Sequence, residues 1–170
     1  MLYEKALQKG LFALIADDWM FKFLYPLTQL SVMRCYLYSK TTHTMIITPI
    51  IGESGGIEVT GEIHERCLQI LIGEHLPTVD YCQFKDFKLN VSFNVNNFPK
   101  VNFRFINGKI HSRTFSVVNC GNVVLEGGEL DVMNFLVSNS TGLEMIGVHG
   151  KIDAITVRNT AKKFVDCTCV

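Results

Sequence analysis

Hydrophobic positions in the second half of the chain recur with a period of twenty residues. When residues 102–170 are aligned with themselves at this spacing, like residues fall together in five columns. The columns are Phe115/Phe135/Ile155, Val117/Val137/Val157, Asn119/Asn139/Asn159, Phe105/Leu125/Met145/Val165 and Phe103/Val123/Leu143. A fixed period of this length is typical of a solenoid, in which one short unit stacks on the next.

Within one period, the hydrophobic residues alternate with polar ones. Leu130 and Val132, and then Phe135 and Val137, follow the two-residue period of a strand that points every second side chain inward. Turn-forming glycine, serine and asparagine residues separate these short strands. We therefore predict a mainly β fold, a parallel β-helix with about three short strands in each coil. Right-handed winding is the default for such parallel crossovers.

The asparagine column adds a likeness to a known fold family. Asparagine tolerates the left-handed conformation of a tight turn, and Asn97 extends the column upward. The column resembles the asparagine ladder of pectate-lyase-like right-handed β-helices, in which stacked side-chain amides hydrogen-bond along one turn. The resemblance implies a single-stranded right-handed parallel β-helix, regular from about residue 83, and brings no catalytic motif. The alternative is that asparagine is simply common in turns.

The first quarter of the chain is aromatic and apolar, and its spacing favours helices. Residues 3–16 have an apolar helical face, and a second short helix is predicted through Trp19, Phe21 and Leu24. Residues 27–37 fit either a helix or a strand. Because the end of a solenoid exposes its core, a terminal cap is required. We predict that residues 1–42 form an N-terminal helical cap on a β-helix of residues 43–170; a partner-binding helical hairpin is the alternative.

Residues 43–82 alternate without forming regular columns, which predicts irregular early coils. Strands are expected at 57–63, with Ile57 and Val59 inward, and at 68–72, followed by a turn. The longest alternation, Phe87 to Val95, leads into the regular part of the solenoid.

Composition narrows the class of protein. Lys plus Arg and Asp plus Glu each number 16, and this zero net charge argues against binding to a nucleic-acid backbone. Apolar runs stay well below the ~20 residues of a membrane span. The six cysteines form no CxxC pair, so we expect reduced, buried thiols in a cytoplasmic protein, with metal ligation or disulfides as alternatives.

Charged residues form two columns that flank the inward Ile110 and Leu130 positions. The first column is Lys109, Glu129 and His149, and the second is His111, Asp131 and Lys151. These side chains could form a surface groove for a sugar chain or a protein, with Glu129 and Asp131 as acid and base. We favour the simpler interpretation that opposite charges are matched across adjacent strands. Without a GxSxG, HExxH or P-loop motif, we expect no catalytic residues, metal site or cofactor, and lean against an enzyme.

The last residues suggest an association face. Phe164, Val165 and Val170 are apolar, and we predict that they belong to a final strand with an unpaired edge. Such an edge templates pairing with another chain. We expect it to bind a second copy of the chain or a partner protein, unless the early coils or N-terminal helices cover it.

Three classes of function are consistent with the sequence. The first, which we favour, is a non-enzymatic protein-interaction or structural module that could form a homo-oligomer through its C-terminal coil. The second is a carbohydrate-binding or carbohydrate-cleaving β-helix. The third is a self-assembling scaffold that resembles bactofilins, although bactofilins have disordered tails that this pattern lacks.

Overall fold

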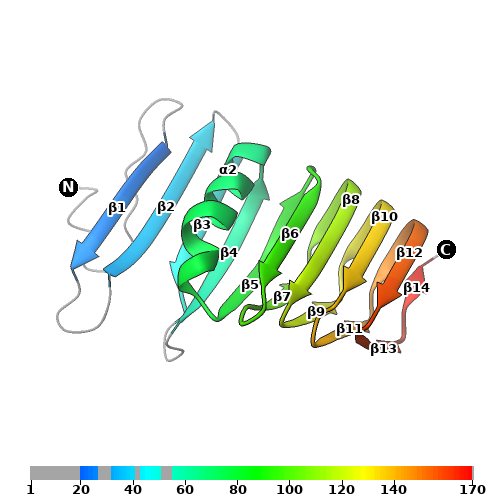
Figure 1. Cartoon of the computed structure of the whole chain (residues 1–170). Coiled ribbons are helices and arrows are strands. Elements are labelled where there is room, and N and C mark those ends of the chain that lie inside the picture. Colours follow the sequence, from blue (N-terminus) through cyan, green and yellow to red (C-terminus); the bar gives the residue numbers. More distant parts are fainter. Residues whose placement is uncertain (1–19, 27–31, 41–42, 51–54, 170) are drawn as a thin grey trace.

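The structure, a computed structural model, describes residues 20–26, 32–40, 43–50 and 55–169, with side chains from Met45 onward. It is a row of stacked strands that runs from the N-terminal to the C-terminal end of the molecule (Figure 1). The strand that begins at Gly56 and the strands after it pair in parallel with the strands that follow them. The predicted parallel β-solenoid is therefore confirmed, with about four turns.

Two rows of parallel strands build the solenoid, and the chain passes from one row to the other in each coil. The first row is β4 (Gly56–Ile63), β5 (Tyr81–Leu89), β7 (Asn102–Ile106), β9 (Asn122–Glu126), β11 (Gly142–Ile146) and β13 (Ala161–Val165). The second row is β6 (Phe93–Phe98), β8 (Lys109–Cys120), β10 (Glu129–Ser138) and β12 (His149–Arg158), and the short β14 (Thr168–Cys169) pairs with β12. The sequence predicted about three short strands in each coil. Two of them, which contain Leu130 and Val132 and then Phe135 and Val137, are joined in the single strand β10. The pairing of β10 with its neighbours is interrupted only at Met133.

The predicted columns are confirmed through three coils and differ in the last one. Phe115 pairs with Phe135, which pairs with Ile155. In the last coil, however, Met145 pairs with Phe164 instead of Val165. The turn between β12 and β13 is one residue shorter than the turn between β10 and β11, so the last step is 19 residues long. As a result Val165 joins an outward column beside Ile146, and Lys162 lies beside Leu143.

The N-terminal strands are antiparallel. β1 (Met20–Pro26), β2 (Val32–Lys40) and β3 (His43–Pro49) form a meander that pairs with β4. The short helix predicted through Phe21 and Leu24 is therefore wrong, because alternating aromatic residues there favour a strand. The strand alternative is right for residues 32–40. The helix predicted for residues 3–16 lies outside the described residues.

A helical segment replaces the second-row strand between β4 and β5. It consists of α2 (Glu65–Ile70), a π-helical turn η1 (Leu71–His75) and a 3-10 turn η2 (Leu76–Thr78). In the view of Figure 1 the helix is drawn over β3 and β4. The strand predicted for residues 68–72 is wrong. Cys67 and Leu71 are four residues apart and both buried, which is the spacing of one helical face. Their side chains belong to the same core as the strands.

Aromatic rings stack along the solenoid axis in the core. Phe93, Phe115 and Phe135 follow one another with centroid distances of 5.1 and 5.0 Å, and Phe84 stacks on Phe105 at 4.7 Å. All five rings are almost completely buried. Burial of each such side chain stabilises the fold by roughly 1.5–3 kcal/mol. Within the described part of the chain, no helix has the length and apolar character needed to cross a membrane.

Candidate functional site

The two predicted charged columns lie on the outer surface of β8, β10 and β12, in the register expected from the sequence. Lys109 pairs with Glu129 and then His149, and His111 pairs with Asp131 and then Lys151. Five of these six side chains take part in ion pairs. They are Lys109 Nζ–Glu129 Oε2 at 3.9 Å, His111 Nδ1–Asp131 Oδ2 at 2.9 Å, and Lys151 Nζ–Asp153 Oδ1 at 2.8 Å.

These contacts define what the charged columns can do chemically. Asp131 accepts a contact from His111, whereas Lys151 turns to Asp153 on its own strand, and that hydrogen bond raises the Lys151 pKa. The side chains are exposed, so each pair stabilises the surface only modestly. Of the two candidate carboxylates, Glu129 faces Lys109 and Asp131 faces His111 on the neighbouring strand. The first two contacts join adjacent coils, whereas the contact of Lys151 with Asp153 lies within one strand.

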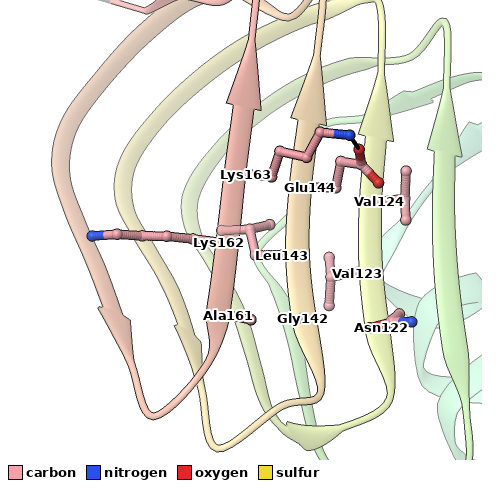
Figure 2. Close-up of a pocket in the computed structure, with 9 residues that line it drawn as sticks. All are labelled: Asn122, Val123, Val124, Gly142, Leu143, Glu144, Ala161, Lys162 and Lys163. Carbon is pink, nitrogen blue, oxygen red and sulfur yellow. Dashed lines mark hydrogen bonds and ion pairs between the residues drawn. The ribbon is translucent and has the colours of Figure 1, made fainter.

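A shallow hollow of about 230 Å³ lies on the outer face of β9, β11 and β13 (Figure 2). It forms where the outward column shrinks from Asn122 to Gly142 and Ala161. An ion pair between Lys163 and Glu144 borders it, as Figure 2 shows. The amide, carboxylate and ammonium groups around the hollow could hydrogen-bond a small polar ligand.

The asparagine column forms tight turns. Asn97, Asn119, Asn139 and Asn159 all have positive φ, between 48° and 68°. The Asn119 side-chain amide donates to Asn97 Oδ1 at 2.7 Å, and that of Asn159 donates to Asn139 Oδ1 at 2.9 Å. All four residues are exposed. A ladder that is continuous through the whole column stays a prediction.

A second polar column, which was not predicted from the sequence, directly follows Asn119, Asn139 and Asn159. Ser140 Oγ accepts from the Cys120 N–H at 3.2 Å and donates to the Ser138 carbonyl. Thr160 Oγ1 repeats this pattern with the Ser140 N–H and the Arg158 carbonyl. These side chains satisfy backbone groups that the turn leaves without strand partners. The available clue was the small polar or thiol side chain that follows Asn119, Asn139 and Asn159.

The C-terminal coil leaves the ends of the core columns uncovered. Phe135 and Met145 are 1% and 2% exposed, whereas Ile155 and Phe164, their neighbours in the last coil, are 52% and 45% exposed. With Val157 and Lys162, these two residues line an open hollow of about 340 Å³. We call Ile155, Val157, Lys162 and Phe164 the end face.

The predicted association residues are placed differently. Phe164 belongs to the end face, and Val165 lies in the neighbouring outward column, half-buried. Val170 is outside the described residues. The backbone at this end is also open. Among the described residues, β13 pairs only with β11, and the outer edge of β12 pairs with β14 only at His149 and Gly150.

The cysteines with described side chains form no disulfide with one another. Cys67, Cys82 and Cys120 are buried, and Cys167 and Cys169 partly so. Burial raises the pKa of Cys82, Cys120 and Cys169, and for Cys169 the neighbouring Cys167 adds to the increase. In the part of the chain that the structure describes, no three His, Cys, Asp or Glu side chains are grouped so that they could hold a metal ion.

The fold places this chain in the class of parallel β-solenoids, with a helical crossover near one end and exposed core columns at the other. Comparison with protein-family models, curated proteins and solved structures finds no match to the chain.

Proposed function

We propose that this chain is a non-enzymatic protein-interaction module whose last coil binds a protein partner. The observation that carries the proposal is the change in burial along the core columns. Phe115 and Phe135 are 0% and 1% exposed, and Ile155 in the next coil is 52% exposed. Another strand laid over the end face would bury Ile155 and Phe164 as each coil buries the previous one.

The open backbone edge supports the same function. β12 and β13 present N–H and C=O groups in the direction in which every earlier coil pairs with the next. Strand addition to such an edge supplies main-chain hydrogen bonds, and pockets for alternate side chains supply specificity. Apolar columns and an open edge therefore favour the same ligand, an extended segment of a protein.

The test compares the chain with a variant altered only at the end face. The intact protein and an Ile155→Lys/Phe164→Lys double variant are each used to capture proteins from an extract of the source cells. We expect a partner retained by the first and lost by the second. With the purified partner, hydrogen exchange should slow at the amides of β12 and β13. Protection elsewhere, with these strands unchanged, would contradict the proposal.

A carbohydrate-binding function is the second candidate, and the hollow in Figure 2 is the observation that favours it. Asn122, Glu144 and Lys163 offer polar groups of the kind that hydrogen-bond sugar hydroxyls. A glycan array separates the two functions. Binding that Glu144→Gln abolishes and Ile155→Lys/Phe164→Lys leaves intact would favour carbohydrate recognition.

A further inference from the structure

A lysine occupies a core column in the last coil. Phe103, Val123 and Leu143 follow one another in this column, and all three are buried. Lys162 is the next member, because it pairs with Leu143. It is exposed, and Figure 2 shows its side chain extending away from the ion pair that its neighbour Lys163 makes with Glu144. Lys162 therefore lies where a further coil would cover it.

The ammonium group of Lys162 has no counter-charge in the described part of the chain. The neighbouring Lys163 pairs with Glu144, whereas no carboxylate lies within ion-pairing distance of Lys162 among the described residues. A strand that covered this column with apolar residues alone would bury an unpaired charge. Such burial is costly enough to oppose binding unless a partner group neutralises the charge.

A second copy of the end face would not supply that group. The column ends of the last coil carry no carboxylate among the described residues; they are Ile152, Ile155, Val157, Thr160, Lys162, Phe164, Cys167 and Cys169. Two copies placed end to end would bring the two Lys162 side chains together with no carboxylate among these column ends. Inward-pointing charges of this kind are a common means of preventing pairing between edge strands.

We infer that Lys162 selects the partner: the end face accepts an extended segment of another protein that carries apolar side chains and one carboxylate, and it excludes a second copy of this chain. This inference rests on the proposed protein-binding function and adds the chemistry of the partner. Apolar residues of the segment cover Ile155 and Phe164, and its Asp or Glu neutralises Lys162. Repulsion of the wrong partner and attraction of the right one then come from the same residue.

The experiment uses full-length chains that differ at residue 162. The proteins are the wild type, Lys162→Leu and Lys162→Glu, with Lys163→Leu as a matched control, because Lys163 points to the outer face of the same strand. Light scattering over a wide range of concentrations measures association. Thermal unfolding confirms that each variant folds, as expected for substitutions at an exposed residue.

We expect the wild type, Lys162→Glu and Lys163→Leu to remain monomeric, and Lys162→Leu to associate at least tenfold more tightly than the wild type. An equimolar mixture of wild type and Lys162→Glu should form a mixed dimer. An antiparallel pair of β13 edges centred on residue 162 would bring lysine and glutamate together on the core side. Added salt should weaken this mixed dimer, because part of its affinity is electrostatic.

The possible results separate this inference from the proposed function. A wild type that dimerises through β13 would overturn the selection by Lys162 and leave the binding face in place. Association of Lys162→Leu without a mixed dimer would overturn the need for a carboxylate. If neither Lys162→Leu nor the mixture associates, the end face does not add strands, and the proposed function fails with the inference.

Discussion

The coil that begins at Glu129 and the coil that begins at His149 share one sequence pattern and differ in their surroundings. Val137 and Val157 occupy the same column, as do Phe135 and Ile155. The first member of each pair is fully buried, and the second is half-buried or exposed. Each coil of a solenoid contacts only its neighbours. A core residue is therefore fully buried when a coil lies on each side of it, and partly exposed when a coil lies on one side alone.

This comparison separates two kinds of interaction. Burial of apolar side chains depends on the number of neighbouring coils, and it differs between the two coils. Backbone conformation at a turn is local and does not depend on them: φ is 50° at Asn139 and 48° at Asn159. Equivalent substitutions in the two coils should therefore differ in cost where burial dominates and agree where local geometry dominates.

The largest difference is expected for a charge placed in the valine column. Val137→Asp should lower the free energy of unfolding by about 4 kcal/mol, because an unpaired carboxylate is then buried between two coils. Val157→Asp, in the last coil, should cost about 1 kcal/mol, since water reaches that position. Urea unfolding measures both values. Equal losses would mean that the last coil is as enclosed as the one before it.

Truncation of side chains in the aromatic column should show the same difference between the two coils, with losses of stability of comparable size. Phe135→Ala removes a ring stacked on Phe115 at 5.0 Å and should cost about 3–5 kcal/mol. Ile155→Ala removes a side chain that is already half-exposed, and about 1 kcal/mol is expected. Urea unfolding again provides the measurement. A larger loss from Ile155→Ala would show that something covers the end face in solution.

The regular columns could be predicted because the twenty-residue period fixes which residues stack. The same period misplaced Val165, since a turn shortened by one residue moves every later side chain to the opposite face. Lys162 was missed for this reason. Nothing in its own surroundings in the sequence marks it as a core position, and only the register with Leu143 does so.

The N-terminal part was harder to predict because its periodicity is mixed. Short apolar segments such as Leu68 to Ile72 fit both a strand and a helix, and the choice depends on what they pack against. Here the helix buries Cys67, Leu68 and Leu71 in the solenoid core. The pairing register of the charged columns follows the twenty-residue period. The partner of Lys151, which is Asp153 on its own strand, followed only from the side-chain geometry.

A smaller effect, equal in the two coils, is expected at the asparagine turns. Asn139→Ala and Asn159→Ala should each cost about 1 kcal/mol, because alanine is strained at positive φ. Asn139→Gly should cost less, since glycine adopts this conformation freely. Thermal unfolding of the three variants measures the difference. If Asn139→Gly costs as much as Asn139→Ala, the side-chain hydrogen bond to Asn159 contributes more than the backbone does.

The smallest effect is expected at the charged columns. Asp131→Asn removes the charge opposite His111, at 2.9 Å, yet both side chains are more than half exposed. Solvent screens such a pair, so the loss of stability should stay below about 0.5 kcal/mol. Asp153→Asn, in the last coil, should shift the unfolding temperature no further than Asp131→Asn does. A large loss from Asp131→Asn alone would contradict charge matching. Polysaccharide degradation that this variant abolishes would instead identify the charged columns as a catalytic site.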